Sequence, residues 1–445
     1  MSDILIIGAG ISGLASACFL KERGHNVRVI EAAAEPGGCM RTVTHKGYLI
    51  EAGPNSTLSK GGAFDDLVRV AGLEAELIEG NVLAKRRYVV KHGVPTPLPG
   101  SPPAFFKTSL FSVRAKFRLF AEPFIGRAKT EETVAQFVRR RLGQEFLDWA
   151  IDPFVSGVYA GDPDKLSARA ATAKVYALEA EHGSLIRGAL ARALRGKASG
   201  PQPRGRLVSF RAGMQALPRA LAMKLGDALQ CDAGATALTR NANGRWQVTA
   251  GTTVHEAEHV VLATAAEQAA ALVEPLDAAL AAEMRAIYYP PVASVALGFA
   301  RAQVRHPLDG FGMLIPSRER LKTLGALFSS TLFPGRAPAG EILLTAFIGG
   351  ARNPSIAELS EAAIVEQVLA DLRALLGIDG EPTMVLVNRW ARAIPQYELG
   401  HLERIGRIDE ALAKWPGLHT RANWRDGISV ADCISHAQAF AARFT

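Results

Sequence analysis

Three glycines near the start of the chain, Gly8, Gly10 and Gly13, have the spacing of a loop that binds a diphosphate. In such a loop the first glycine allows a tight turn and the second lets the backbone approach a pyrophosphate, while the third brings a helix close to a strand. Glu31 follows at the distance of roughly 20 residues at which a carboxylate accepts hydrogen bonds from ribose hydroxyls. These residues predict a dinucleotide site; the alternative is a chance glycine-rich turn.

The elements that must position these residues can also be predicted. Asp3–Ile7 is a short apolar run typical of a buried parallel strand, and Asn26–Ile30 has the same character. Between them Leu14–Arg23 is helical in pattern, with Gly24 as its expected C-cap. A helix that begins directly after the glycines would direct its positive N-terminus at the diphosphate. The order strand, turn, helix, strand therefore supports the dinucleotide site.

The middle of the chain changes character. Residues 95–206 carry few strand signals and many basic residues, with helical patterns over 131–142 and 170–194. A Gly-, Pro- and Ser-rich stretch, 196–205, predicts a surface loop.

Strand signals return after residue 205. Two strands are predicted at 245–249 and 258–263, flanking a Gly-Thr-Thr turn. Further strands are expected at 292–299 and 343–348, an amphipathic helix at 361–376 and a last helix near 430–444.

Composition excludes several classes of protein. The chain has 445 residues, of which 48% are hydrophobic and 21% charged, so we expect a globular protein of two or three domains. Its charge of +8 suits an anionic membrane or an acidic substrate better than nucleic acid, because no nucleic-acid-binding motif is present. No run is long and apolar enough for a spanning helix, and we expect a cytoplasmic protein. The four cysteines lack metal-ligand spacing, so we expect free thiols and no metal.

A second glycine loop follows the predicted acid. The segment 35–42 reads EPGGCMRT, and Glu51-Ala-Gly-Pro54 comes shortly afterwards. With this GGxxRT loop the chain resembles the flavin amine oxidase superfamily. The resemblance implies that Gly37, Gly38 and Arg41 reach the diphosphate and ribityl chain of FAD; the duller alternative is a turn with a solvated arginine.

Two distant segments extend this resemblance. Residues 260–264 look like the strand that closes the FAD domain, and residues 422–433 look like the element that directs a helix N-terminus at the flavin, although Ala422 stands where glycine is common. No cysteine is suitably placed for a covalent flavin bond, so we expect noncovalent FAD. The cofactor-binding residues predicted in this way are Gly8, Ala9, Gly10, Ile11, Ser12, Gly13, Glu31, Ala32, Gly37, Gly38, Arg41, Thr42, Gly53, Pro54, Asn55, Ala235, Trp390, Ile428, Ser429 and Val430. For Trp390, packing alone is nearly as good an explanation.

Within the superfamily the chain resembles the oxygen-dependent protoporphyrinogen oxidases over essentially its whole length. The resemblance is carried, in the family's order, by 153–171, 209–218, 310–316, 345–350 and 394–401. It implies removal of six electrons from protoporphyrinogen IX in three flavin cycles, with oxygen as acceptor. Because this chemistry is centred on the flavin, no catalytic side chain is expected; His92, His401 and His436 have no motif to recommend them as a base.

The same resemblance implies four substrate-binding residues. Arg87 matches an arginine that pairs with a propionate, a task suited to the fork of a guanidinium, although Arg86 stands beside it. Leu314 and Phe347 match apolar positions that pack on the tetrapyrrole, and plain core positions are equally plausible. Gly157 matches a glycine whose backbone lies near the substrate.

The predicted fold is α/β (α+β overall) in three parts. A discontinuous, Rossmann-like FAD-binding domain of the p-hydroxybenzoate hydroxylase and amine oxidase type would hold 1–74, 205–270 and 406–445. A mixed-sheet substrate domain would hold 75–100 and 271–405, and a helical insertion 101–204.

Other readings and partners stay open at this stage. The alternatives are coproporphyrinogen III oxidation, a flavin amine oxidase or carotenoid-type desaturase, and a non-enzymatic flavoprotein. Trp424 and Tyr397 could be misread as the aromatic pair that flanks the amine in amine oxidases. Residues 105–120 alternate aromatic and basic side chains, which suits either peripheral contact with the cytoplasmic membrane face or packing on the helical core. A homodimer and transient contact with a ferrochelatase are also open.

Overall fold

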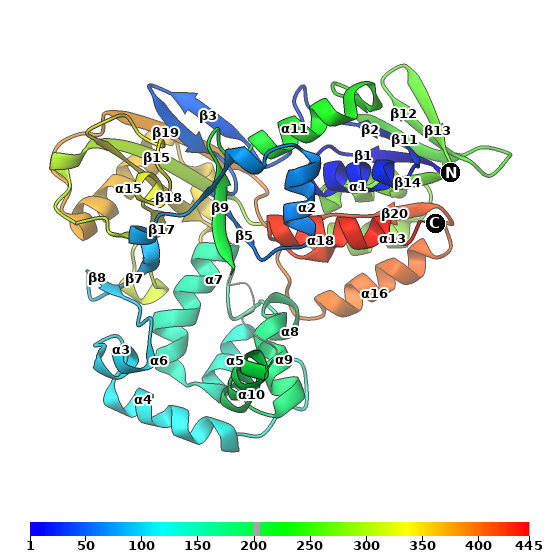
Figure 1. Ribbon diagram of the computed structural model, residues 1–445. Coiled ribbons are helices and arrows are strands. Elements are labelled where there is room, and N and C mark those ends of the chain that lie inside the picture. Colours follow the sequence, from blue (N-terminus) through cyan, green and yellow to red (C-terminus); the bar gives the residue numbers. More distant parts are fainter. Residues whose placement is uncertain (199–204, 445) are drawn as a thin grey trace.

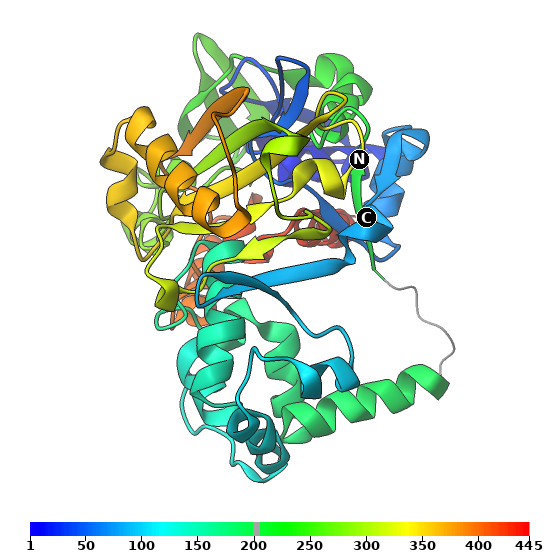
Figure 2. The same cartoon turned by 90° about the vertical axis from the view of Figure 1, so that its left-hand side faces the viewer.

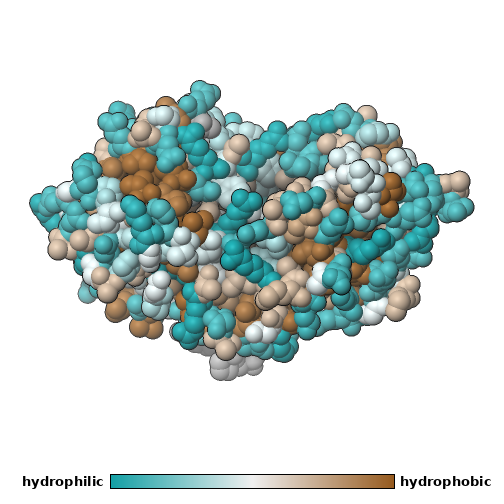
Figure 3. Space-filling model, turned by 90° about the horizontal axis from the view of Figure 1, so that it is seen from above, coloured by the Kyte–Doolittle hydropathy of each residue, from teal (hydrophilic) through white to brown (hydrophobic). Residues whose placement is uncertain are grey.

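The computed structural model describes residues 1–198 and 205–444. The chain forms two sheet-containing lobes side by side, with a group of helices below them (Figure 1). Turned by 90°, the helices again lie beneath both lobes (Figure 2). From above, apolar residues are exposed in patches on both lobes (Figure 3). This mixture confirms the predicted α/β class with a mixed sheet and a helical insertion. The proposed three-part division stays a prediction, and its boundary at residue 204 lies outside the described residues.

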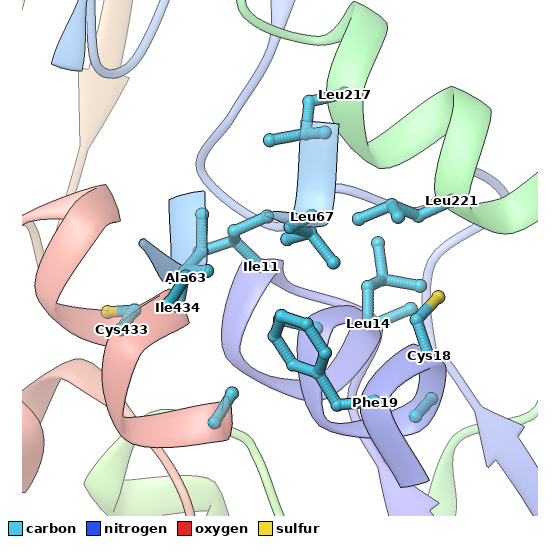
Figure 4. Packing of buried hydrophobic residues seen from close by; sticks show 14 of the residues in the cluster. Ile11, Leu14, Cys18, Phe19, Ala63, Leu67, Leu217, Leu221, Cys433 and Ile434 are labelled. Atoms are coloured by element: carbon cyan, nitrogen blue, oxygen red, sulfur yellow. The ribbon is translucent and has the colours of Figure 1, made fainter. Parts of the chain in front are cut away.

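One lobe is built on a parallel sheet with the strand order β10-β2-β1-β14-β20. Its strands are β1 (Asp3–Ile7), β2 (Asn26–Ile30), β10 (Leu229–Gln230), β14 (His259–Leu262) and β20 (Leu418–Thr420). The helices on one of its faces are α1 (Ile11–Glu22), α2 (Ala63–Val70), α11 (Ala216–Leu225) and α18 (Val430–Ala441). Their apolar sides share one core, in which Leu14, Leu67, Leu217 and Ile434 meet from four helices (Figure 4). The first and last helices of the chain therefore pack together.

Strands β1 and β2 coincide with the predicted ones, whereas the two strands expected on either side of the Gly-Thr-Thr turn do not pair with each other. The meander consists of β11 (Ala235–Arg240), β12 (Trp246–Ala250) and β13 (Thr253–Ala257). The turn at Gly251 thus leads into β13, and residues 258–263 form a separate strand, β14, that pairs with β1. The other face of the parallel sheet packs on α12 (Ala266–Val273), α13 (Ala278–Arg285) and α16 (His401–Leu412).

The second lobe contains a sheet with the order β19-β15-β18-β17-β16-β7-β8. Its strands are β7 (Arg86–Lys91), β8 (Val94–Pro97), β15 (Val292–Ala300), β16 (Gly310–Leu314), β17 (Thr323–Leu327), β18 (Glu341–Gly349) and β19 (Met384–Trp390). Neighbours run antiparallel except β7 and β16. Helix α15 (Glu361–Leu376) covers one face and supplies Ile364, Val368 and Leu372 to its core. Because side chains alternate along a strand, the other face holds a second set of residues.

The remaining strands and helices outside the helical part are short. They are β3 (Thr42–His45), β4 (Tyr48–Glu51), β5 (Thr57–Ser59), β6 (Leu77–Glu79), β9 (Arg206–Phe210), α14 (Ser329–Leu332) and α17 (Asn423–Asp426). Single 3₁₀ segments occur at 74–76, 82–85, 119–124, 226–228, 301–303, 317–319 and 354–358.

The helical part contains more breaks than the sequence pattern predicts. Its helices are α3 (Pro102–Lys107), α4 (Val113–Arg118), α5 (Val134–Arg141), α6 (Gln144–Phe146), α7 (Asp152–Tyr159), α8 (Ala168–Ala171), α9 (Ala173–His182) and α10 (Leu185–Ala198), with a π-helical turn at Leu147–Ile151. The single helix expected over 170–194 is wrong, because the chain turns at Gly183, whose φ is +72°. The carboxylate of Glu122 then accepts hydrogen bonds from the backbone N–H groups of Leu185 and Ile186 at the start of α10.

Ends of other predicted helices also shift. Thr133 caps α5 in a reciprocal box with Gln136, so this helix begins at residue 134 instead of 131. Helix α18 ends at Ala441, before the predicted Phe444. In the described part of the chain, no helix combines the length and apolar character needed to cross a bilayer.

Candidate functional site

The first glycine loop connects β1 to α1 in a close-packed turn. Gly8 has a φ of +106°, and a Cβ on Gly13 would lie 2.0 Å from the Gly8 carbonyl oxygen. Alanine at position 13 would therefore force the helix away from the strand. Gly10 is the N-cap of α1, and a Cβ there would meet nothing within 4 Å. Space thus remains over Gly10 at a helix N-terminus, where a diphosphate is favoured. The backbones of Ala9, Ile11 and Ser12 complete this turn.

Glu31 lies at the end of β2, as its predicted role requires. Its carboxylate accepts hydrogen bonds from the backbone N–H groups of Ala9 at 2.6 Å and Ala33 at 2.9 Å. The neighbouring Ala32 is exposed and lies against Gly234, one residue before Ala235 at the start of β11. The carboxylate and the predicted positions 32 and 235 are therefore brought to one edge of the parallel sheet.

The second glycine loop lies against the first. The Gly37 N–H donates to the Ala9 carbonyl at 2.8 Å, and a Cβ on Gly38 would lie 3.2 Å from the Gly10 Cα. The side chain of Arg41 is exposed. The Thr42 hydroxyl donates to Glu51 at 2.7 Å.

A third segment, 52–55, rests on the second loop. A Cβ on Gly53 would lie 1.8 Å from the Cys39 carbonyl oxygen, so the two backbones touch. The Trp390 indole N–H, from β19 of the other lobe, donates to the Ala52 carbonyl at 3.0 Å. Pro54 follows, and the Asn55 amide donates to the Gly53 carbonyl at 3.2 Å. Trp390 therefore has a defined hydrogen-bonding role in holding this segment.

The start of α18 completes the cofactor side of the site. Ser429 caps the helix by accepting from the Asp432 N–H at 3.0 Å, and Ile428 and Val430 flank it. Ala422 adopts extended backbone with a φ of −158°, a conformation open to any residue, so alanine is accommodated where glycine is common. The N-termini of α1 and α18 thus belong to two helices that pack side by side.

We call these segments, 8–13, 31–32, 37–42, 53–55 and 428–430, the dinucleotide cradle. Backbones of its three loops touch one another, and open space remains over a helix N-terminus. The arrangement fits an extended dinucleotide, whose long diphosphate arm needs more than one loop of donors.

Four predicted substrate residues come from four elements, and three of them share one sheet face. Register pairs Leu314 with Gly325 and Gly325 with Phe347, so these residues form a row across β16, β17 and β18. Arg87 lies on the same face, because Tyr88 on the same strand packs on the opposite side with α15. Leu314 and Phe347 are both partly exposed, so neither is plain core.

The structure distinguishes the two neighbouring arginines. Arg86 pairs with Asp309. Arg87 is exposed, its guanidinium lies 5.4 Å from the centre of the Phe311 ring, and among the described residues no carboxylate pairs with it. Arg87 is therefore the arginine that is available to an external carboxylate.

Gly157 closes this surface from the helical part. It lies on α7, which rises from the helices towards the seven-stranded sheet (Figure 1). A Cβ on Gly157 would lie 2.4 Å from the Leu314 Cδ2 atom, so helix and strand are in direct contact. We call Arg87, Gly157, Leu314 and Phe347 the substrate face.

The aromatic pair considered for an amine substrate does not form an open site. Trp424 is fully buried, and its indole N–H donates to the Thr264 carbonyl at 3.1 Å. Tyr397 stacks on His401 with ring centres 4.1 Å apart, and its hydroxyl accepts from the Gly427 N–H at 2.9 Å. Tyr397 thus holds the segment before α18, a role that sequence motifs alone did not reveal.

The three histidines considered as possible bases have different environments. Burial lowers the pKa of His401 to about 4, which suits a packed, neutral ring. His92 is exposed, and its ring packs beside Trp149, whereas His436 is exposed on α18. Among residues 1–198 and 205–444 no cluster of side chains could hold a metal ion.

Comparison with known proteins identifies the family. The sequence profile described as "Flavin containing amine oxidoreductase" matches residues 11–443. A chloroplastic protoporphyrinogen oxidase from Nicotiana tabacum is 36% identical, over 100% of this chain and 85% of its own. A coproporphyrinogen III oxidase from Bacillus subtilis is 32% identical, over 99% of this chain and 98% of its own.

Solved structures agree with this placement. A provisionally named protoporphyrinogen oxidase from an Exiguobacterium species superposes with a TM-score of 0.84 at 25% identity, over 99% of this chain and 98% of that one. Putrescine oxidase shares the fold, with a TM-score of 0.72 at 20% identity over 99% and 98% of the two chains. The chain therefore belongs to the flavin-containing amine oxidoreductase family, and it is a flavin-dependent oxidoreductase whose relatives include protoporphyrinogen and coproporphyrinogen III oxidases.

Proposed function

We propose that this protein binds FAD noncovalently and oxidises protoporphyrinogen IX to protoporphyrin IX, with oxygen as the final acceptor. The observation that carries the proposal is the substrate face: an arginine without a carboxylate partner among the described residues lies on the same sheet face as partly exposed apolar side chains. Protoporphyrinogen IX presents the matching chemistry, because its two propionates project from one edge of a largely apolar macrocycle. Relatives named for porphyrinogen oxidation support the same reading.

The residues have distinct tasks in this proposal. Bound FAD supplies two-electron oxidation, so three cycles remove six electrons and six protons and convert three O₂ to three H₂O₂. Arg87 would pair with a propionate and fix the macrocycle's orientation. Leu314 and Phe347 would pack on its face and exclude water, and Gly157 would let α7 approach closely.

Noncovalent attachment is supported by the state of Cys433. This cysteine is buried in α18, where its thiol lies 3.5 Å from the Gly427 carbonyl. Burial raises the pKa of Cys433 to about 12, so the thiolate that covalent attachment would need is scarce. Acid precipitation should release intact FAD into the supernatant, whereas flavin retained on the precipitated chain would contradict the proposal.

The decisive experiment compares two substrates without oxygen. Purified protein is mixed anaerobically with protoporphyrinogen IX or coproporphyrinogen III, and bleaching of the flavin near 450 nm is followed in both. Air is then admitted and porphyrin fluorescence is recorded. We expect fast bleaching by protoporphyrinogen IX. Preference for coproporphyrinogen III, the second candidate because of the Bacillus subtilis relative, would move the activity to that substrate. Bleaching by neither would refute porphyrinogen oxidation.

We also propose that the helical part contacts a membrane surface. On α4 and the following 3₁₀ segment, Phe117, Phe120 and Phe124 are 62–82% exposed, close to the basic Arg114 and Arg118. Exposed aromatic and basic side chains together suit an anionic interface. Sedimentation with anionic vesicles should fall for Phe117→Ser/Phe124→Ser, and equal sedimentation of variant and wild type would argue against this surface. A homodimer and transient contact with a ferrochelatase stay predictions.

A further inference from the structure

A buried ion pair lies between the two lobes, next to the cradle. Arg336, from the connection between β17 and β18, contacts Glu51 at the end of β4 at 3.3 Å, and their side chains are only 2% and 3% exposed. Burial raises the pKa of Glu51 and lowers that of Arg336, so each charge depends on its partner. A pair buried so fully adds little net stability, because desolvation offsets the attraction between the charges. Its position therefore needs another explanation.

Glu51 connects three segments of the cofactor lobe. Its carboxylate accepts from the Thr42 hydroxyl at 2.7 Å and from the Met214 N–H at 2.9 Å. The segment 52–55 of the cradle follows directly after it. Each oxygen of this carboxylate thus holds a different segment, and a shift of Glu51 would move the second and third loops of the cradle together.

Arg336 connects the other lobe to the same place. Its guanidinium donates to the Ser209 hydroxyl at 2.8 Å and to the Phe210 carbonyl at 3.2 Å, while the Arg336 carbonyl accepts from the Leu49 N–H at 3.1 Å. A small cavity of about 10 Å³ adjoins the pair, and Asn55 of the cradle also lines it. The pair therefore reaches a segment that is among the predicted cofactor-binding residues.

The substrate-side lobe anchors the segment 52–55 at its N-terminal end through two separate sets of contacts. Arg336 contacts Glu51, the residue just before the segment, and Asn388 and Trp390 of β19 donate to the Ala52 carbonyl at 3.2 and 3.0 Å. The sheet that contains Asn388 and Trp390 also carries Leu314 and Phe347, and Arg336 lies in a connection between two of its strands. The position of segment 52–55 is thus tied to the sheet that carries the substrate face.

We propose that Glu51 and Arg336 are positioning residues that hold segment 52–55 of the cofactor site, and with it the bound FAD, in register with the substrate face. The inference rests on the proposed function only for the identity of the substrate. The role of the pair in positioning the cofactor requires only that FAD binds. Loss of either charge leaves the other buried without its partner, so segment 52–55 should shift relative to β16–β18.

The test uses Glu51→Gln, Arg336→Lys and the double variant Glu51→Leu/Arg336→Met in the full-length holoenzyme. Arg219→Gln is the control, because Arg219 pairs with the exposed Glu35 in the same lobe and both side chains are more than half exposed. FAD affinity, the visible circular dichroism of bound flavin, the melting temperature, and KM and kcat are measured for each. Gln is nearly isosteric with Glu, and Arg336→Lys provides a second variant that keeps the charge.

We expect Glu51→Gln to weaken FAD binding at least tenfold, to change the flavin's visible circular dichroism and to lower kcat more than it raises KM. Arg336→Lys should show the same changes to a smaller extent, and Arg219→Gln should match wild type. The double variant separates stability from position: we expect its melting temperature to recover, while the dichroism stays altered.

Two results would overturn the proposal: FAD affinity and dichroism within twofold of wild type in both single variants, or recovery of both in the double variant. If the wild-type protein turns over no porphyrinogen, only the proposed function fails. FAD affinity and flavin dichroism do not depend on turnover, so they still decide the role of the Glu51–Arg336 pair.

Discussion

The dinucleotide cradle and the substrate face use different parts of the chain to make a binding surface. In the cradle, glycine backbones touch, and the atoms that would bind are N–H groups held by loops such as 8–13 and 37–42. On the substrate face, side chains of Arg87, Leu314 and Phe347 project from a regular sheet, and register alone aligns them. Where backbones of the cradle touch, as at Gly13 and Gly53, there is no room for an extra methyl group. On the substrate face, one side chain can be replaced by another without a change in the backbone.

This difference predicts how each region responds to mutation. A change in the cradle alters the backbone, so it should abolish cofactor binding outright. A change on the substrate face alters one contact, so it should adjust substrate affinity in steps while the cofactor stays bound.

The largest effect is expected for Gly13→Ala. The new Cβ would lie 2.0 Å from a backbone oxygen, which cannot move aside as a side chain can. Overpacking of this kind costs about 1–3 kcal/mol in unfolding free energy, and the displaced helix N-terminus should lose FAD. Denaturation and flavin content are the measurements. Gly406→Ala is the matched control, because its Cβ would meet nothing within 4 Å on α16. Normal flavin content in Gly13→Ala would break the contrast between the two regions.

Acid should weaken the cradle before the substrate face. The pKa of His401 falls from its ordinary 6.5 to about 4 through burial, so the folded protein keeps this ring neutral. The stabilisation is complete above pH 6.5 and is lost as the pH falls from 6.5 towards 4, by about 3 kcal/mol at most. Because His401 stacks on Tyr397, which holds Gly427 before α18, FAD should be released as the pH approaches 4 and the folded ring takes up a proton. Fluorescence of freed FAD reports it.

The control for this pH effect is His401→Phe. Phenylalanine keeps a ring on Tyr397 but cannot take up a proton, so the variant should retain FAD near pH 4, where the wild-type protein loses it. Identical acid sensitivity in variant and wild type would show that another group controls the release.

A smaller, graded effect is expected for Arg87→Ala. A charge-assisted hydrogen bond contributes about 1.5–3 kcal/mol, so KM for protoporphyrinogen IX should rise roughly 10- to 100-fold with normal flavin content. Arg86→Ala is the control, since Arg86 is already paired with Asp309 at the surface. Steady-state kinetics with both variants checks the assignment, and a larger effect at Arg86 would reverse it.

The smallest effect is expected for Gly157→Ala. Its Cβ would meet the end of the flexible Leu314 side chain at 2.4 Å, and Leu314 can change rotamer to relieve the contact. We expect KM to rise several-fold, with unchanged flavin content and melting temperature. Loss of flavin in this variant would mean that the substrate face and the cradle are not independent.

The sequence predicts the cradle well because its parts lie close together along the chain. Strands β1 and β2 and the glycine loop between them follow from local pattern, although α1 begins at Ile11, directly after its N-cap, instead of Leu14. The residues of the substrate face could be predicted only from the resemblance to a known family, because four elements that are far apart in the sequence supply them. Alternation along β7 implies that Arg86 and Arg87 face opposite ways, yet the position of α15 is needed to tell which face is covered.

Other features depend on tertiary contacts that no local pattern encodes. Arg336 looks like one more basic residue in a basic chain until the fold buries it against Glu51. The break at Gly183 depends on Glu122, some sixty residues earlier, which caps α10. Strand β13 was missed because its residues, TVHEA, are mostly polar and exposed, so the apolar run at 258–263 was taken as the next strand after the turn.

The order of the parallel sheet has a consequence for how the protein is made. Strand β1 begins at Asp3, but its sheet is complete only when β20 (Leu418–Thr420) joins β14, and α1 waits for α18. A ribosome adds roughly 5–20 residues per second, so the apolar first strand and helix wait on the order of tens of seconds for their last partners. During synthesis this N-terminal segment must be shielded by chaperones or by partial folding, and nascent chains stopped before residue 418 should be the most prone to aggregate.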